Sequence, residues 1–201
     1  MNNTALIIVD VQNDFCENGS LEVKKANEII PLINNIRKTY NFSYTILTQD
    51  YHPNDHISFN NSPHLNTDIH LDSVTNKWKG KFPPHCVQNT EGANFHPNLE
   101  LNGSEQIFKK GRNSFREEFS GFCNSDLILF IKENNINRIF VVGLAYDFCV
   151  ANTAIDGKNA GLETYIIRDL SRGIGDGEEI TKEMENIGIK IITSDDLKQI
   201  I

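Results

Sequence analysis

Two short apolar runs constrain the fold of this chain more than any other feature of its sequence. Residues 5–11 read ALIIVDV and residues 138–142 read RIFVV, so both are rich in β-branched or aromatic residues and lack strict polar/apolar alternation. Such runs are typical of strands that are covered on both faces, as in parallel sheets flanked by helices. The two runs therefore predict a sheet buried between layers of helices.

Further strands alternate with helices along the rest of the chain. The predicted strands cover residues 5–11, 42–48, 105–109, 138–142, 163–168 and 189–193. The predicted helices cover 26–40, 124 or 125 to 134, a segment after residue 147, and 177–187. This order predicts an α/β fold: a six-stranded, mostly parallel sheet with helices on both faces, in three layers of the Rossmann type.

Length and composition limit the class of protein. At 201 residues the chain suits one domain, so we expect a single domain over residues 1–201. A net charge of −8 disfavours nucleic acid and anionic membranes as partners, and no apolar run approaches a membrane span. The N-terminal run lacks a basic leader and is interrupted by Asp10, so we expect no signal peptide. Four scattered cysteines without a C-x-x-C pair favour the reducing cytoplasm.

Four chemically capable residues stand at or just beyond the ends of predicted strands. They are Asp10, Asp50, Lys110 and Cys149. Because parallel sheets bind ligands at the carboxyl ends of their strands, we expect these side chains to meet. A thiol, a carboxylate and an ammonium together form an acid/base-assisted nucleophile. Strand alternation puts Lys109 on the opposite side from Lys110, so only one of the two lysines is expected to face the site.

Cys149 is the candidate nucleophile. Asp147 is predicted to cap a helix, which places Cys149 in the first turn of that helix after a central strand. Unpaired backbone N–H groups and the helix dipole there predict a lowered pKa for the thiol and a place for an oxyanion. The alternative is that Cys149 is a small buried apolar residue, as most free cysteines are.

All six histidines lie in the stretch 51–104, which shows no helical or strand periodicity. A long irregular stretch inside a compact domain is usually functional. Asp50 and His52 lie on one side of an extended backbone, His56 follows a turn, and His85 follows two prolines. This set suits zinc, iron or manganese without discriminating among them. The alternative is a polar loop that carries histidines without a metal.

Five segments of the chain resemble the nicotinamidases, a branch of the isochorismatase-like cysteine hydrolases. The segments are IIVDVQNDF (7–15), QDYHPNDHISF (49–59), FPPHC (82–86), Lys110-Gly111 and GLAYDFCV (143–150). They occur in order over nearly the whole chain. The second and third segments single out the nicotinamidase branch, whereas the Asp, Lys and Cys are shared more widely.

The resemblance implies a role for each matched residue. Asp10, Lys110 and Cys149 match a catalytic triad. Asp50, His52 and His85 match metal ligands, and His56 matches a residue that is a ligand in some members only. The Leu144–Ala145 bond matches a cis peptide that turns the Ala145 and Cys149 amides toward an oxyanion, and Phe15 and Phe82 match positions that hold the substrate ring. Phe82 stands where tryptophan is usual and Phe119 where tyrosine is common, which leaves the substrate breadth open.

The implied reaction is hydrolysis of nicotinamide to nicotinate and ammonia through a thioester, as a step of NAD salvage in the cytoplasm. One divalent metal is implied, with zinc placed before iron or manganese. One alternative is a related amidase that acts on a ureido or carbamoyl substrate. Another is a non-catalytic protein that binds nicotinamide or senses thiol oxidation. The oligomeric state stays open.

Overall fold

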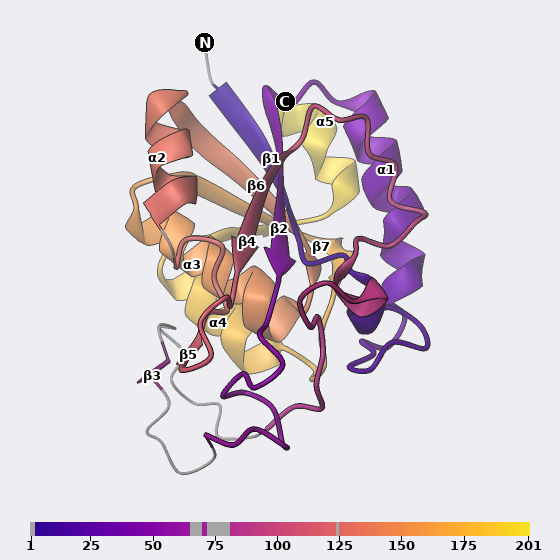
Figure 1. The fold of residues 1–201 in the computed structure, drawn as a ribbon. Helices are drawn as coiled ribbons and strands as arrows, with labels where there is room; N and C mark the ends of the chain where they lie inside the picture. The colour runs from indigo at the N-terminus through magenta and orange to yellow at the C-terminus, as the bar shows by residue number, and fades with distance from the viewer. Residues whose placement is uncertain (1–2, 65–69, 72–80, 124) are drawn as a thin grey trace.

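The fold is built on a six-stranded sheet in which every described strand pairing is parallel (Figure 1). The computed structural model describes residues 3–64, 70–71, 81–123 and 125–201. The strand order is β4-β2-β1-β6-β7-β8, with bounds β1 Asn3–Val9, β2 Tyr44–Asp50, β4 Gln106–Lys110, β6 Ile136–Leu144, β7 Glu163–Arg172 and β8 Lys190–Ile192. The prediction of a six-stranded parallel sheet is confirmed.

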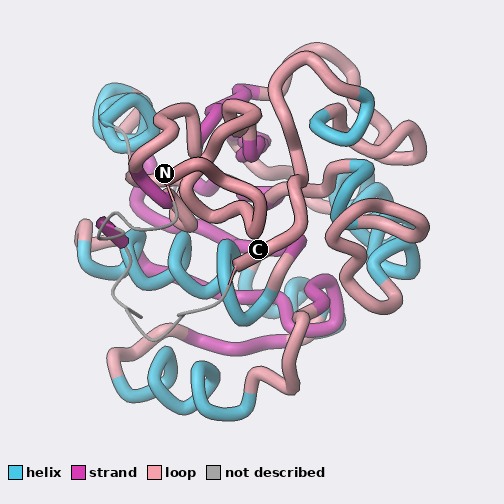
Figure 2. Tube along the Cα trace, turned by 60° about the horizontal axis from the view of Figure 1, so that its bottom comes forward, coloured by secondary structure: helices cyan, strands magenta, loops and turns pink. Residues whose placement is uncertain are grey.

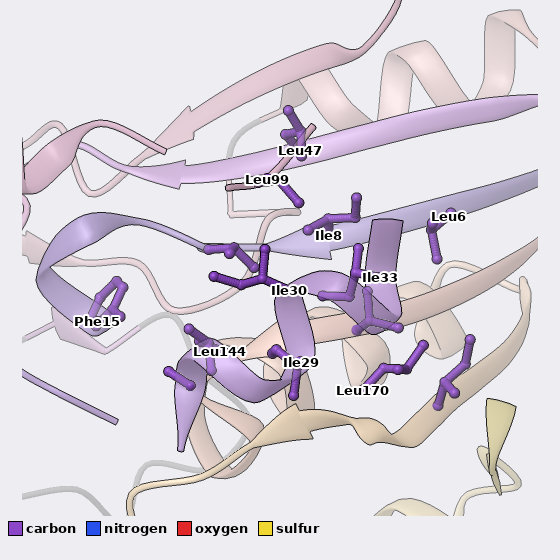
Figure 3. Close-up of a cluster of buried hydrophobic side chains, with 14 of the residues drawn as sticks. Leu6, Ile8, Phe15, Ile29, Ile30, Ile33, Leu47, Leu99, Leu144 and Leu170 are labelled. Carbon is purple, nitrogen blue, oxygen red and sulfur yellow. The ribbon is translucent and has the colours of Figure 1, made fainter. Parts of the chain in front are cut away.

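Helices cover both faces of this sheet, as predicted (Figures 1 and 2). One face carries α1 (Ile29–Thr39) and α5 (Leu197–Ile200), and the other carries α2 (Ser125–Glu133), α3 (Ala151–Asn159) and α4 (Glu178–Asn186). Alternate residues of β1 serve the two layers. Leu6 and Ile8 belong to the same core as Ile29 of α1 (Figure 3), whereas Ile7 belongs to the core that contains Ala154 of α3.

The direction of winding reverses between β1 and β6. From β1 the sheet extends one way through β2 and β4, and the other way through β6, β7 and β8. In doubly wound sheets of this kind, ligands bind beyond the carboxyl ends of the strands at the point of reversal. Asp10 directly follows β1 and Cys149 follows β6, so both lie at this point.

Some boundaries differ from the predictions. β6 continues to Leu144, so Gly143 lies inside the strand rather than ending it. A 3-10 turn over Ala26–Glu28 precedes α1, and Pro31 lies in the first turn of α1, where the missing N–H costs no hydrogen bond. Lys110 is the last residue of β4 rather than the residue after it.

The connections contain short elements. They include the further 3-10 turns η1 (Asn13–Phe15), η3 (Glu91–Ala93) and η5 (Ser194–Asp196). They also include the strands β3 (His70–Leu71) and β5 (Arg116–Glu117), which form a small parallel sheet. The small sheet was not predicted, because two-residue strands leave no periodic pattern. Residues 65–69 and 72–80 of the predicted loop region, and Asn124 as a helix cap, lie outside the described residues. Within the described part of the chain, no helix is both long and apolar enough to cross a membrane.

Candidate active site

Three predicted residues meet at the carboxyl edge of the sheet. The Nζ atom of Lys110 lies 2.8 Å from Oδ2 of Asp10 and 3.4 Å from Sγ of Cys149. All three residues are buried. The expectation that these strand ends converge is therefore confirmed, and the contact places an acid, an ammonium and a thiol in one group.

The orientation of Lys110 follows from strand pairing. β4 pairs with β2 so that Lys110 lies opposite Asp50, and its Nζ donates to the Asp50 carboxylate and to the Glu118 carbonyl, the latter at 3.3 Å. The preceding residue, Lys109, is exposed, and its Nζ lies 3.7 Å from the centroid of the Tyr51 ring. Only one of the two lysines faces the site, as predicted.

Asp10 is fixed by a residue that the sequence analysis missed. Its φ of 49° turns the chain directly after β1, and its Oδ1 accepts a 2.6 Å hydrogen bond from the Thr48 hydroxyl. Thr48 lies two residues before Asp50 on β2 and is fully buried. A single threonine in an apolar strand is common, so only its spacing to Asp50 could have pointed to this role.

Burial sets the protonation of the group. Burial raises the pKa of Asp10 above its usual value, and Lys110 offsets this only in part. Burial raises the pKa of Cys149 well above its usual value too; Lys110 opposes this, and the carboxylates of Asp10 and Asp50 add to it. The predicted lowering of the Cys149 pKa is therefore wrong, because it considered the helix end without the burial and the two neighbouring carboxylates. The thiol keeps its proton until a base takes it.

Cys149 lies in a single π-helical turn, η4 (Tyr146–Val150), which joins β6 to α3. Such turns are frequent at functional sites. The Leu144–Ala145 peptide bond that precedes the turn is cis, as predicted. Asp147 does not cap a helix: it lies within the turn, and its carboxylate accepts hydrogen bonds from the backbone of residues 174 and 175. The prediction of Asp147 as a cap is wrong. A helix capped by Asp147 would begin at Phe148, whereas the observed turn begins two residues earlier, at Tyr146.

The candidate metal ligands also come together. Asp50, His52 and His85 present ligand atoms that all lie within 4.8 Å of one another. Nδ1 of His52 donates to the Gly111 carbonyl at 2.9 Å, and its buried Nε2, 3.4 Å from Oδ2 of Asp50, has no hydrogen-bond partner. Nδ1 of His85 donates to the Pro83 carbonyl at 2.9 Å in the same way. When a carbonyl accepts a hydrogen bond from one ring N–H of a neutral histidine, the other ring nitrogen carries a lone pair that can bind a metal. This arrangement is typical of metal-binding histidines. The set fits a divalent ion.

Two of these three residues, Asp50 and His85, have the charge that a metal ligand needs. Although burial alone would raise the pKa of Asp50, Lys110 and His52 hold it below the usual range. Burial, together with His52, lowers the pKa of His85 to about 4. A carboxylate and a neutral imidazole are the forms that bind metals. Although burial alone would lower the pKa of the third residue, His52, the Asp50 carboxylate raises it above its usual value, so a metal there would displace a proton. The backbone of Asp50 is held by Gln12, whose side chain bonds both its N–H and its C=O at 2.8 Å.

His56 lies beside this set and belongs to a second possible ligand cluster with His52 and Glu117, whose ligand atoms also lie within 4.8 Å of one another. Its ring centroid is 4.1 Å from that of His52, but its Nε2 donates to the Arg116 carbonyl at 2.9 Å and its Nδ1 lies 2.7 Å from the Ser58 hydroxyl. Both ring nitrogens are thus engaged by the protein. Binding of a metal by His56 would require the loss of one of these hydrogen bonds, so His56 as a ligand stays a prediction.

Aromatic side chains pack against His85, and their contacts continue to Phe148, the residue before the candidate nucleophile. The Phe15 and Phe82 rings lie 5.4 and 5.6 Å from the His85 ring, centroid to centroid. Phe82 also contacts Phe148 at 5.8 Å, and Phe148 contacts Phe119 at 5.6 Å. The two residues predicted to hold a substrate ring therefore lie next to the candidate metal ligands.

Comparison with known proteins places this site in a family. Residues 4–196 match the family model described as the isochorismatase domain. A nicotinamidase from Acinetobacter baylyi is 39% identical over 204 residues, which cover 96% of this chain and 94% of that protein. These alignments span all the candidate site residues.

Solved structures agree in fold. A nicotinamidase/pyrazinamidase from Acinetobacter baumanii has a TM-score of 0.86 at 35% identity and covers 98% of this chain and 99% of its own. A pyrazinamidase from Pyrococcus horikoshii, solved in complex with zinc, has a TM-score of 0.79 at 33% identity and covers 95% and 99%. From this agreement in sequence and fold, we conclude that the chain belongs to the isochorismatase family, in its nicotinamidase branch.

Proposed function

We propose that this protein hydrolyses nicotinamide to nicotinate and ammonia. Its relatives establish it as a hydrolase that acts on an amide. The observation that carries the proposal is the contact of Lys110 with both Asp10 and Cys149, directly beside the Asp50, His52 and His85 set. A nucleophile with an adjacent proton acceptor is the arrangement that amide hydrolysis requires. The neighbouring candidate metal ligands suit a substrate that, like nicotinamide, has a ring nitrogen able to bind a metal.

In the proposed first half-reaction, Sγ of Cys149 attacks the carboxamide carbon while Asp10 accepts the thiol proton. Burial raises the pKa of Asp10, which makes its carboxylate a stronger base toward the thiol. Lys110 stays charged, since Asp10 and Asp50 outweigh the burial that would lower its pKa. The Ala145 and Cys149 amides are the proposed oxyanion donors. The C–N bond then breaks, Asp10 returns the proton to nitrogen, and ammonia leaves a thioester.

In the second half-reaction, a water molecule attacks the thioester carbon. Asp10 takes one proton from this water, the S–C bond breaks, and the same proton passes from Asp10 to the Cys149 sulfur. Nicotinic acid leaves with the oxygen and the second proton of the water and ionises to nicotinate in solution, and the thiol is restored. One carboxylate thus acts as acid and base in turn, which requires that it be shielded from bulk water; Asp10 is fully buried.

Asp50, His52 and His85 are the proposed ligands of one divalent metal ion. When bound, such an ion supplies a Lewis acid that binds the ring nitrogen of the substrate. Zinc is our first choice, because the Pyrococcus horikoshii pyrazinamidase was solved with zinc, and iron or manganese suit the same donors. Phe15 and Phe82 are proposed to pack on the two sides of the ring.

The proposal is tested by incubating the purified protein with nicotinamide and measuring ammonia and nicotinate together. We expect equimolar formation of both products. Benzamide, which lacks the ring nitrogen, serves as the control and should react far more slowly, because it loses the contact to the metal. If nicotinamide is inert and a ureido or carbamoyl compound releases ammonia instead, the proposed substrate is wrong.

We expect Thr48→Val to lower kcat about tenfold, because valine keeps the shape but removes the hydroxyl that donates to the Asp10 carboxylate. That hydrogen bond lowers the pKa of Asp10, so its loss keeps Asp10 protonated to higher pH. The acid limb of the kcat/KM profile should therefore move to higher pH. Thr164→Val is the matched control, since Thr164 is buried in β7 and its hydroxyl donates to the Leu162 carbonyl rather than to a site residue. An equal effect in both variants would contradict the role of Thr48.

Three broader proposals accompany the reaction. We propose one domain over residues 1–201, which the family match over 4–196 supports. We propose a cytoplasmic location, which four free cysteines support, because such thiols persist in a reducing compartment. We further propose that the product nicotinate enters NAD salvage.

A further inference from the structure

We infer that Asp147 is a positioning residue that clamps the Cys149 turn to the loop following β7. For its effect on catalysis this inference rests on the proposed function. The loop spans Gly173 to Gly177 and connects β7 to α4. Neither Asp147 nor this loop takes part in the chemistry described above. The two are nevertheless hydrogen-bonded to each other, and Asp147 lies only two residues before Cys149 in the chain.

The clamp consists of two hydrogen bonds to one carboxylate. Oδ1 of Asp147 accepts from the Ile174 N–H at 2.9 Å, and Oδ2 accepts from the Gly175 N–H at 2.6 Å. Hydrogen bonds to an ionised acceptor are roughly twice as strong as neutral ones. Because each oxygen takes one N–H of two consecutive residues, the contact fixes both the distance and the orientation of the loop relative to the turn.

The sequence of the loop permits this close approach. A Cβ atom on Gly173 would lie 2.9 Å from Oδ1 of Asp147, and one on Gly175 would lie 3.1 Å from Oδ2. A side chain at either position would push the carboxylate away. The two glycines on either side of Ile174 therefore explain why the loop can wrap around Asp147.

The neighbouring residue anchors the same turn from another direction. The hydroxyl of Tyr146 lies 2.5 Å from Oγ1 of Thr181 in α4, and the guanidinium carbon of Arg168 lies 4.1 Å from the centroid of the Tyr146 ring. Tyr146 is fully buried. Side chains of two consecutive residues thus tie the turn to β7, to α4 and to the loop between them.

This attachment matters because the partners of Cys149 come from other elements. Asp10 follows β1 and Lys110 ends β4, so the distance from Sγ to them depends on where the η4 turn lies relative to these two strands. The turn also carries the Cys149 amide, and the carbonyl of Ala145, the residue before the turn, accepts from the Phe148 and Val150 N–H groups at 3.0 and 3.1 Å. A misplacement of about 1 Å can lower a rate about 100-fold.

The test compares Asp147→Asn with Asp176→Asn. In the first variant the amide NH₂ faces one of the two N–H donors, so one hydrogen bond is lost and a repulsive contact replaces it. Asp176 lies in the same loop, is exposed, and accepts only from the Glu178 N–H at 3.1 Å, so it is the matched control. We expect Asp147→Asn to lower kcat at least about tenfold with KM within about twofold, and Asp176→Asn to leave both unchanged.

Amide hydrogen exchange supplies the second measurement and needs no substrate. We expect faster exchange in Asp147→Asn over residues 145–150 and 173–177, with unchanged exchange in β1 and α1. Unchanged kcat, or exchange that rises throughout the chain, would overturn the clamp. If wild-type protein does not hydrolyse nicotinamide but the local change in exchange occurs, the clamp stands and only the proposed function fails.

Discussion

Replacing Cys149 by alanine is expected to lower kcat for nicotinamide at least about 10⁴-fold, because no other group can then form the thioester. Within the described part of the chain, Cys149 is the cysteine that lies next to both Lys110 and the Asp10 carboxylate. The change removes one sulfur from a buried position, so the fold should persist. Ammonia release by wild-type and variant protein, each checked by its melting temperature, measures the effect.

Two further variants sharpen this experiment. Cys123→Ala is the matched control, since Cys123 lines a separate surface cavity with Phe122 and Asp156, and we expect its kcat within about twofold of wild type. Combining Cys149→Ala with Asp10→Asn should cost little more than Cys149→Ala alone, because nucleophile and base act as a unit. Substantial turnover by Cys149→Ala would refute the nucleophile assignment, and full additivity in the double variant would refute the coupling to Asp10.

The fold and the meeting of the candidate catalytic residues were predictable because they follow from local pattern and topology. Doubly buried strands indicate a parallel sheet, and a parallel sheet brings the residues at its strand ends to one edge. Asp10, Lys110 and Cys149 met the expectation for this reason, although more than 130 residues of chain separate the first from the last. The opposite directions of Lys109 and Lys110 followed from strand alternation in the same way.

Other features depended on contacts between elements whose relative positions cannot be deduced from the sequence. The support of Asp10 by Thr48 and of Asp50 by Gln12 required the pairing of β2 beside β1. The pKa of Cys149 was predicted in the wrong direction, since the helix end was visible in the sequence while the degree of burial was not. Asp147 looked like a cap because aspartate before an apolar helical face usually is one; its partners lie 27 and 28 residues further along the chain.

Three histidines that differ in their relation to the proposed metal site can be compared by substitution. We expect His85→Ala to lose bound metal and to lower kcat/KM at least about 100-fold, because changes even to groups behind a ligand cost 10- to about 100-fold. His56→Ala should keep the metal, since both ring nitrogens of His56 are engaged by the protein. His96→Ala is the control, because His96 lies outside the site and accepts from the Asn98 N–H at 3.2 Å. Elemental analysis and nicotinamide turnover on the same samples measure both effects.

Chelation separates a ligand role from a structural role for these residues. Dialysis of wild-type protein against a chelator should abolish turnover, and adding back zinc should restore it. His56→Ala should follow the same cycle, whereas His85→Ala should regain little activity at equal zinc because it lacks one of the three proposed ligands. Wild-type turnover that persists with no metal detectable would show that Asp50, His52 and His85 serve another purpose. Loss of metal in His56→Ala with retention in His85→Ala would exchange the places of these two histidines in the site.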